Sequence, residues 1–272
     1  MNAPAVDTPR RSFVDQVMGM PVSVLVRGPA ARTDELADVV ARVHAELHEV
    51  DRRFSTWRPD SAVSRLRRQE LPPDDVPADV QEVLRRCDDA RQRTGGWFDA
   101  SLPDADGVRR TDPTGLVKGW AVERAARHLA ALEGHDWLVN AGGDVVAQAR
   151  YGAPWRVGVE DPRDRSRVLA RLPLVSGGVA TSGSAARGPH VVDPRTGAPA
   201  AALLSATVVG PSLCEADVQA TAAFAQGPAS IERLEALPGY EALLVHLDGH
   251  VARTTGPSTA APDAVRPAAG AR

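Results

Sequence analysis

Apolar residues recur every three to four positions in several stretches of the chain, which is the spacing of one face of an α-helix. One helix is predicted over 33–53, with Thr33 as its N-cap. Its apolar face carries Leu36, Val39, Val40, Val43 and Leu47. A second amphipathic helix is predicted over 78–93, ended by Gly95-Gly96, and a third over 118–132. Shorter helices are predicted at about 215–224 and 230–237.

Short apolar segments bounded by turn residues predict strands. They lie at 22–26, 137–139, 145–149, 156–160, 168–175, 191–192 and 206–209. A closing hairpin is predicted from 243–247 and 250–253 around Asp248-Gly249, a dipeptide that suits a tight turn. Strands and helices are grouped rather than regularly alternating, so the pattern favours an α+β fold over a doubly wound sheet.

The two ends of the chain differ in composition from the rest. Residues 1–12 and 254–272 are rich in Pro, Ala and small polar residues, which predicts disordered tails. The remaining residues, 13–253, are expected to form one domain, and no internal repeat is visible.

Composition narrows the class of protein. The chain has 272 residues, of which 43% are hydrophobic and 25% charged, as is usual for a globular protein. The net charge is −3 and arginines are interspersed with acids, which argues against nucleic acid as the main partner. An apolar run of the roughly 20 residues needed to span a bilayer is missing, and so is a leader-like apolar stretch. Cys87 and Cys214 are predicted to be free thiols, and the expected location is the cytoplasm.

Among 32 lysines and arginines only Lys118 is a lysine. Arginine is a planar fork, whereas lysine is a compact point charge on a thin stem that suits a phosphate or a tight pocket. Lys118 follows a turn and opens a predicted helix, and Asn140, one of two asparagines, opens the turn Asn-Ala-Gly-Gly-Asp at 140–144. Chance survival of one lysine is the alternative.

Asp217 and Thr221 are four residues apart on a predicted helix, so their oxygens share one face about one turn apart. A carboxylate and a hydroxyl in this arrangement suit a hard cation such as Mg²⁺. Considered alone, the pair also fits a solvated helix face or a capping pair.

Three further segments carry candidate chemistry. In 182–197, His190 lies between a glycine-bearing loop and a strand, while Asp193 and Arg195 fit a tight turn. In 54–66, Trp57 is flanked by polar donors that suit a planar ligand; alternatively, Ser61 caps a short helix and Trp57 belongs to the core. Gly-Gly-Trp-Phe-Asp at 95–99 permits close approach of a ligand to the backbone, or is a helix C-cap followed by buried aromatic residues. The turn at 140–144 lacks the spacing of a Walker loop or a dinucleotide fingerprint.

Together these segments and their neighbours resemble one family. In chain order they are Met-Gly-Met-Pro-Val-Ser-Val (18–24), Phe-Ser-Thr-Trp-Arg-Pro-Asp-Ser, Gly-Gly-Trp-Phe-Asp, Gly-Leu-Val-Lys-Gly-Trp-Ala-Val, Leu-Val-Asn-Ala-Gly-Gly-Asp, Trp-Arg-Val-Gly-Val-Glu-Asp-Pro, Ala-Thr-Ser-Gly-Ser, His-Val-Val-Asp-Pro-Arg-Thr-Gly, Ala-Thr-Val-Val-Gly-Pro and Glu-Ala-Asp-x-x-x-Thr. The chain is similar to the ApbE-type FAD:protein FMN transferases over about residues 14 to 250.

The resemblance implies a single domain with a mixed, largely antiparallel sheet, surrounding helices and two lobes around a flavin cleft. It implies Mg²⁺-dependent cleavage of FAD, with transfer of FMN to a Thr hydroxyl of an acceptor protein and release of AMP. The implied metal ligands are the carbonyl of Gly115, the carboxylate of Asp217 and the hydroxyl of Thr221. FAD is expected to lie against Met18, Trp57, Trp97, Phe98, Asp99, Asp112, Lys118 and the backbone near Val192. Lys118 and His190 are the candidate catalytic residues.

Two segments depart from the family pattern. Only about a dozen residues separate Asp99 from Asp112, where the family usually carries a long insertion, and the segment 182–190 is short. Both lie beside the expected flavin pocket. Two alternatives therefore stand beside the transferase: an FAD pyrophosphatase that yields AMP and FMN, and an inactive flavin-binding scaffold.

Overall fold

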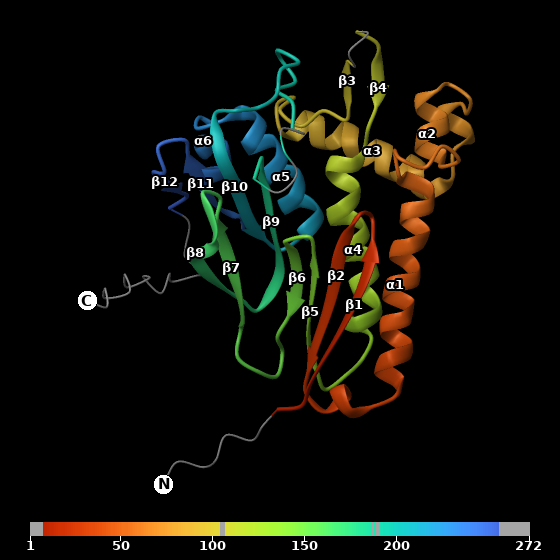
Figure 1. The fold of residues 1–272 in the computed structure, drawn as a ribbon, viewed down its shortest axis with the longest axis vertical. Coiled ribbons are helices and arrows are strands. Elements are labelled where there is room, and N and C mark those ends of the chain that lie inside the picture. Colours follow the sequence, from red (N-terminus) through yellow and green to blue (C-terminus); the bar gives the residue numbers. More distant parts are fainter. Residues whose placement is uncertain (1–7, 104–106, 186–187, 189–190, 256–272) are drawn as a thin grey trace.

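The computed structural model describes residues 8–103, 107–185, 188 and 191–255. Its main feature is an eight-stranded sheet in the order β1-β2-β5-β6-β9-β10-β11-β12, with every neighbouring pair antiparallel (Figure 1). The strands are β1 (Arg10–Val17), β2 (Met20–Arg27), β5 (Asp136–Ala141), β6 (Asp144–Gln148), β9 (Ser176–Gly183), β10 (Leu203–Gly210), β11 (Glu241–His246) and β12 (Val251–Arg253). Two separate hairpins are formed by β3 (Ser101–Pro103) with β4 (Arg109–Thr111) and by β7 (Trp155–Asp161) with β8 (Asp164–Leu174).

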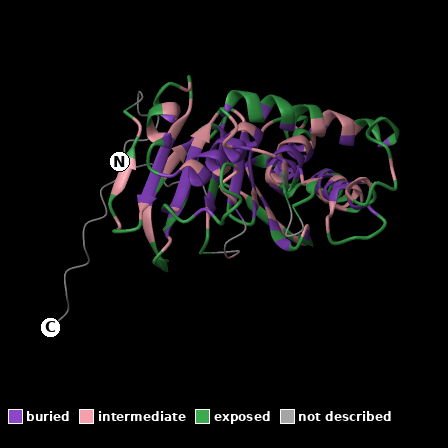
Figure 2. Ribbon diagram, turned by 90° about the horizontal axis from the view of Figure 1, so that it is seen from above, coloured by how far each residue is buried: buried purple, intermediate pink, exposed green. Residues whose placement is uncertain are grey.

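Helices cover one face of the sheet (Figure 1). The long helices are α1 (Glu35–Phe54), α3 (Ala78–Arg93), α4 (Thr114–Ala130) and α5 (Leu213–Gln226). The short ones are α2 (Ala62–Arg67), α6 (Ser230–Glu235) and two 3₁₀ turns, Pro29–Arg32 and Pro73–Asp75. Buried positions are concentrated in the strands of the sheet and on the helix sides that face it (Figure 2). None of the helices in the described ranges is long and apolar enough to cross a membrane.

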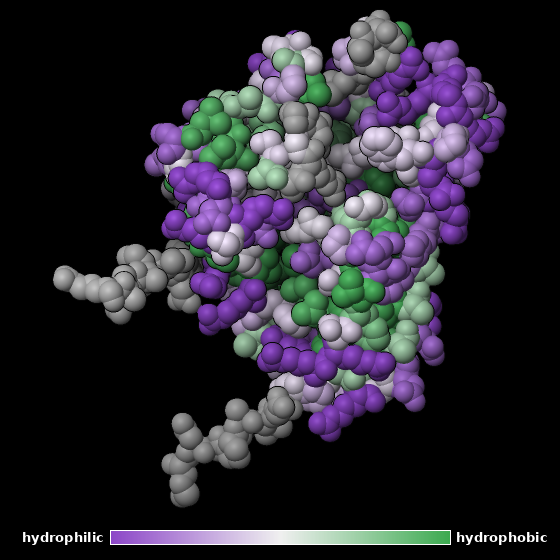
Figure 3. All heavy atoms as spheres, viewed as in Figure 1, coloured by the Kyte–Doolittle hydropathy of each residue, from purple (hydrophilic) through white to green (hydrophobic). Residues whose placement is uncertain are grey.

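The core follows the alternation of side chains along each strand, because successive residues point to opposite faces of a sheet. The side toward the helices takes Val139, Val146, Ala180 and Leu244. The other side takes Leu138, Val145 and Val179, together with Val157 and Leu174 of the β7–β8 hairpin. That hairpin therefore covers part of the face opposite the helices. The face of the molecule shown in Figure 3 is a mixture of polar and apolar surface. Val14, an exposed apolar residue, belongs to β1, an edge strand of the sheet.

The expected α+β fold with a largely antiparallel sheet and surrounding helices is confirmed; its division into two lobes around a cleft stays a prediction. The bounds of α3 agree with the predicted 78–93, while α4 begins four residues before the predicted 118. Free, buried thiols are confirmed at Cys87 and Cys214.

Three local predictions are wrong, and one strand was not predicted. The N-cap of α1 is Asp34, because the Thr33 hydroxyl donates to the Ala30 carbonyl of the preceding 3₁₀ turn. Strand β1 begins at Arg10, inside the predicted tail 1–12, because its pairing with β2 continues to Arg27. At 191–192 there is an isolated bridge, between Val192 and Pro199, rather than a strand. The small residues of β9 predicted no strand at all, yet they form the centre of the sheet.

Small residues are required in β9 because α5 lies directly against it. A Cβ placed on Gly178 would lie 2.5 Å from Cα and 2.6 Å from Cβ of Leu213, the first residue of α5. Neither contact can be relieved by rotating a side chain. Glycine has a low β-propensity, but here it is the residue that allows the close contact between strand and helix.

Gly178→Ala is expected to lower the free energy of unfolding by about 1–3 kcal/mol, the usual cost of overpacking a core. Gly158→Ala in β7 is the matched control, because its added Cβ would meet only Val168, at 3.6 Å, an ordinary contact. Urea denaturation of both variants measures the difference. Equal stabilities would contradict this account of β9.

Candidate functional site

Helix α5 carries the predicted carboxylate and hydroxyl, Asp217 and Thr221, on one side. The helix begins at Ser212, whose hydroxyl accepts a hydrogen bond from the Glu215 N–H at 3.2 Å and so caps the first turn. Asp217 is buried, and its Oδ2 accepts a hydrogen bond from the Gly119 N–H of α4 at 3.0 Å. The predicted pair therefore faces into the contact between α4 and α5 rather than out to solvent, which excludes the solvated-face alternative for Asp217.

The single lysine of the chain lies between two carboxylates. The Lys118 Nζ is 2.5 Å from Oδ2 of Asp144 and 3.6 Å from Oδ1 of Asp217. The side chains of the two aspartates are 2% and 3% exposed, and that of Lys118 is 17% exposed. Coulomb attraction is strong at such distances when water is largely excluded. Lys118 thus neutralises part of a buried acidic pair.

Asp144 reaches this position from the turn between β5 and β6. The turn is formed by Gly142 and Gly143, with φ of 61° and 103°, and the Gly143 N–H donates to Oδ1 of Asn140 at 2.9 Å. Glycine suits these positive φ values because it has no Cβ. Oδ1 of Asp144 in turn accepts from the Thr181 N–H of β9 at 3.2 Å. The Gly-Gly turn therefore shapes the loop that places Asp144, and Asn140 has a structural role within it.

Gly115, whose carbonyl is an implied metal ligand, lies next to Thr221, whose hydroxyl is another. A Cβ placed on Gly115, in the first turn of α4, would be 3.2 Å from Cε2 of Phe98 and 3.9 Å from Cγ2 of Thr221. The Thr221 hydroxyl is 3.1 Å from the hydroxyl of Ser182 on β9. Gly115, Phe98, Thr221 and Ser182 therefore form one contiguous group beside Asp217.

The environment of Asp217 changes its acidity. Burial, with a smaller contribution from the neighbouring Asp144 carboxylate, raises the pKa of Asp217 to about 7, although the Lys118 ammonium and the Gly119 N–H both oppose this rise. The pKa of Asp217 therefore depends strongly on nearby charges, here those of Lys118 and Asp144.

Two of the expected flavin contacts are neighbours in the chain, and one of them, Phe98, lies against Gly115. Trp97 is half-buried and precedes the buried Phe98, and the Arg195 guanidinium lies 3.9 Å from the centre of its ring. Arg195 belongs to the turn that Asp193 builds by accepting the Arg195 N–H at 2.8 Å. The stacking brings the 193–197 turn beside the 95–99 segment.

Met18, with φ of 54°, lies in the β1–β2 turn. That turn borders the β5–β6 turn, where the Gly142 N–H donates to the Pro21 carbonyl at 3.2 Å. Met18 and Asp144 therefore lie at the same end of their strands, in neighbouring turns.

Asp99 and Asp112 are both held by arginines. Oδ2 of Asp99 is 3.2 Å from Arg91 Nε and 2.9 Å from Arg109 Nη2. Asp112 pairs with Arg67 at 3.0 Å and also accepts a hydrogen bond from the Thr114 N–H at 3.1 Å, at the start of α4. Both carboxylates thus have a structural role of their own, and a contact with FAD stays a prediction.

The remaining expected contacts lie apart or outside the described residues. Trp57 is 94% exposed, so the alternative that it belongs to the core is wrong, whereas the alternative that Ser61 caps a short helix is confirmed by its bond from the Ser64 N–H at 3.0 Å. Val192 forms the isolated bridge to Pro199 and is partly exposed. His190 lies outside the residues that the structure describes, and its role stays a prediction.

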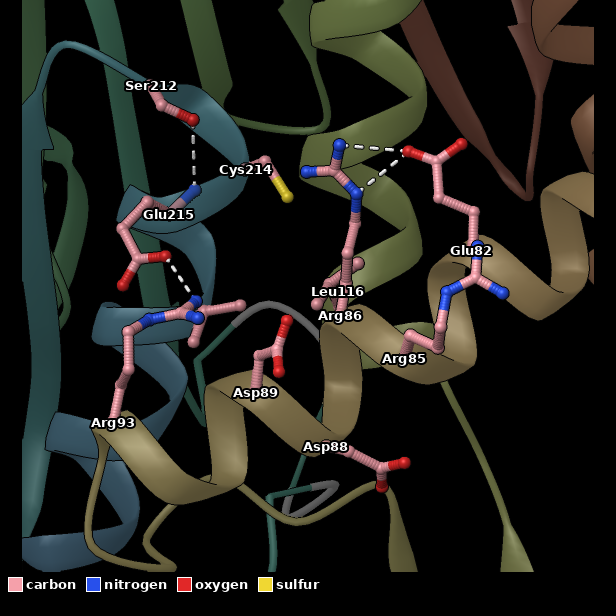
Figure 4. A pocket seen from close by; sticks show the side chains of 11 residues that line it. Glu82, Arg85, Arg86, Asp88, Asp89, Arg93, Leu116, Ser212, Cys214 and Glu215 are labelled. Carbon is pink, nitrogen blue, oxygen red and sulfur yellow. Dashed lines mark hydrogen bonds and ion pairs between the residues drawn. The ribbon is translucent and has the colours of Figure 1, made fainter.

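A cavity of about 540 Å³ opens between α3 and α5 (Figure 4). Its walls are mostly charged and include the pairs Arg86–Glu82, at 2.9 Å, and Arg93–Glu215, at 2.8 Å. Cys214 also lines it; burial raises the pKa of this thiol to about 12, so it stays protonated. The cavity is thus made by residues other than the Lys118 group.

Comparison with known proteins identifies the family. The model of the ApbE family matches residues 18–110 and 104–244, most of the described chain. The chain belongs to the ApbE family. Two of its relatives are named FAD:protein FMN transferase. The one from Klebsiella pneumoniae is 26% identical, over 79% of this chain and 78% of its own. The one from Escherichia coli K12 is 31% identical, over 58% of this chain and 47% of its own. These names bear out the predicted enzyme class, a transferase.

Solved ApbE structures have the same fold. The flavin transferase ApbE from Vibrio cholerae matches with a TM-score of 0.78 at 20% identity, covering 91% of this chain and 98% of its own. The ApbE protein from Thermotoga maritima matches with a TM-score of 0.76 at 22% identity, covering 90% of this chain and 97% of its own.

Sequence reasoning missed two members of the buried group. Asp144 was noted only as the end of a turn, and Ser182 only as part of a small-residue segment. A signal for Asp144 was present: an acid that follows Gly-Gly directly and precedes the apolar pair Val145-Val146 is placed at the start of a buried strand. Ser182 has no such signal, because its position depends on the pairing of β9 with β10.

The raised pKa of Asp217 predicts a pH dependence of stability in the metal-free protein. The unfolded chain releases the Asp217 proton near 3.8, whereas the folded chain keeps it until about 7. Between these values the unfolded state binds fewer protons, so the free energy of unfolding falls as pH rises. Asp217→Asn lacks this proton, so its stability relative to wild type should increase across the window. Urea denaturation with EDTA on both sides of the window measures this, and a constant difference would contradict the assignment.

Proposed function

We propose that the protein transfers FMN from FAD to a Thr hydroxyl of an acceptor protein, with Mg²⁺, and releases AMP. The observation that carries the proposal is the group of oxygens where α4 meets α5. Asp217 and Thr221 lie one turn apart on α5, Gly115 packs beside Thr221, and Lys118 stands next to Asp217. Membership of a family whose relatives are named FAD:protein FMN transferase supports the substrate.

The residues present fit a hard divalent cation. Mg²⁺ prefers oxygen ligands and keeps several positions for water and phosphate. The Gly115 carbonyl, the Asp217 carboxylate and the Thr221 hydroxyl would hold it. Asp144 and Asp217 are both buried and face one ammonium, so whenever both are ionised these three side chains carry an excess of negative charge that a cation would compensate. When bound, Mg²⁺ would neutralise negative charge on the pyrophosphate of FAD and on the departing AMP.

The transfer breaks a phosphoanhydride bond and forms a phosphoester bond. The oxygen of the acceptor hydroxyl forms a bond to the FMN phosphorus while the pyrophosphate bond to AMP breaks. AMP leaves with the electron pair of that bond, and the hydroxyl proton is released. Such a reaction depends mainly on positioning and on electrostatic stabilisation.

The chain's own residues supply both effects. Lys118 presents a compact ammonium that can donate a hydrogen bond to a phosphate oxygen. The faces of Trp97 and Phe98 are suited to a flat ring, and the low exposure around Asp217 strengthens each electrostatic contact. A histidine in the 182–197 segment, His190, is proposed to contact the phosphoryl group or the incoming hydroxyl. Trp57, Asp99, Asp112, Met18 and Val192 are proposed to line the flavin site.

The deciding assay incubates the purified protein with FAD and Mg²⁺, with and without an acceptor domain that contains a Thr, and follows AMP release and in-gel flavin fluorescence. AMP together with a fluorescent acceptor band is the expected result. AMP in the absence of a labelled acceptor would indicate the pyrophosphatase alternative. If neither AMP nor a fluorescent acceptor band is found, the result favours the flavin-binding scaffold. The short segments 99–112 and 182–190 would then be the first to test for a loss of activity.

Asp217→Ala is expected to reduce Mg²⁺-dependent AMP release on the order of 100-fold or more, because several kcal/mol of charge stabilisation are lost with the metal. Glu232→Ala, which removes an exposed carboxylate of α6, is the control and should keep wild-type rates. A metal-independent, active Asp217→Ala enzyme would refute the metal assignment.

Lys118→Arg is expected to slow turnover more than an ordinary surface substitution, although it conserves charge. The guanidinium is wider than the ammonium, and the space between Asp144 and Asp217 is only a few ångströms across. Steady-state AMP release measures the loss, with Arg163→Lys, an exposed arginine paired with Asp161, as the comparison. Equal effects of the two exchanges would show that the site does not require the shape of lysine.

A further inference from the structure

The charges at the contact of α4 with α5 are unbalanced in a specific way. Asp144 and Asp217 come from different elements, the β5–β6 turn and α5, and both are almost completely buried. A single ammonium, that of Lys118, serves both. Leaving either carboxylate ionised and buried without a counter-charge destabilises the folded state. Together with the N–H groups of Gly119 and Thr181, Lys118 therefore allows the fold to tolerate this acidic pair in the absence of a metal.

The distances show which carboxylate holds the lysine. Nζ is 2.5 Å from Asp144 but 3.6 Å from Asp217, so the direct ion pair is with Asp144. Asp144 is itself fixed by the Thr181 N–H, whereas Asp217 offers Oδ1 toward the lysine and uses Oδ2 for the Gly119 N–H. The ammonium can give up Asp217 without losing its main partner.

We propose that Lys118 is a built-in counter-ion that stands in for the divalent cation at Asp217, and that Asp144 is the positioning residue that retains the lysine when the cation arrives. This inference rests on the metal part of the proposed function. When both carboxylates are ionised, the summed charge of Lys118, Asp144 and Asp217 is one negative, and a bound divalent ion changes it to one positive. Metal binding therefore makes this group more favourable for the pyrophosphate of FAD.

Competition between Lys118 and the cation has a direct thermodynamic consequence. Whatever the ammonium contributes to Asp217 in the metal-free protein must be given up on binding, so the lysine weakens metal affinity. Removing its charge should therefore tighten metal binding while destabilising the metal-free fold. Removing the charge of Asp144 should do the reverse, because Lys118 then loses its 2.5 Å carboxylate partner and the Asp217 carboxylate beside it becomes relatively more important.

The test measures Mg²⁺ binding by isothermal titration calorimetry and the Tm with EDTA and with saturating Mg²⁺, in the absence of FAD. Lys118→Met is expected to bind Mg²⁺ at least about tenfold more tightly than wild type, to have a lower Tm in EDTA, and to gain more from Mg²⁺. Asp144→Asn is expected to bind at least about tenfold more weakly, with its Tm in EDTA maintained. Arg93→Met is the control: it removes a positive charge paired with Glu215 on α5 and should leave Mg²⁺ affinity within about twofold.

Unchanged or weaker binding by Lys118→Met, with wild type binding Mg²⁺ normally, would overturn the inference and leave the proposed transfer intact. If neither protein binds Mg²⁺, the metal assignment fails together with the inference. Expected shifts in affinity without FMN transfer would uphold the inference and refute the transferase. Should Lys118→Met not fold, the double variant Lys118→Met with Asp144→Asn removes one charge of each sign, and its failure to bind Mg²⁺ more tightly than Asp144→Asn alone would equally overturn the inference.

Discussion

The close approach of α4 to α5 at Gly119 sets the geometry of the whole site. A Cβ at this position would lie 2.9 Å from Cβ of Asp217, 3.0 Å from Cα of Cys214 and 3.0 Å from the Leu213 carbonyl oxygen. The absent side chain lets the Gly119 N–H reach the Asp217 carboxylate at 3.0 Å. One contact thus serves both as helix packing and as the anchor of the central carboxylate. Because Gly115 and Lys118 precede it on the same helix, their positions relative to α5 depend on it as well.

The second constraint comes from the sheet. The α5 helix can reach β9 only because that strand has glycine where a side chain would meet Leu213. This contact brings Thr221 to Ser182, while the preceding residue of β9, Thr181, holds Asp144. Two tight glycine contacts, one helix–helix and one helix–strand, therefore enclose an acidic pair whose burial is compensated by N–H groups and by Lys118. The same glycine contacts that allow close packing thus also position the polar side chains of the site.

Much of this could be read from the sequence where the information is local. Helix α3 follows directly from its apolar spacing and its glycine stop, and the four-residue interval of Asp217 and Thr221 places them on one side of α5. Strand β9 could not be found locally, because its small residues reflect a neighbour far away in the chain. The partnership of Lys118 with Asp144 was hidden for the same reason: it requires the turn between β5 and β6 to lie beside α4. For Trp57 the sequence left two environments open, a ligand contact or the core, and its 94% exposure excludes only the core.

The replacement of lysine by arginine nearly everywhere has a practical chemical consequence. Lys118 carries the single side-chain primary amine of the sequence, and this amine lies inside the site with only 17% of the side chain exposed. Guanidinium groups react poorly with reagents that acylate or reductively alkylate amines, so such reagents have one internal target in this protein. A lysine-specific label would therefore act as a reporter whose reactivity follows the occupancy of the buried carboxylate pair, with no engineering of the remaining surface.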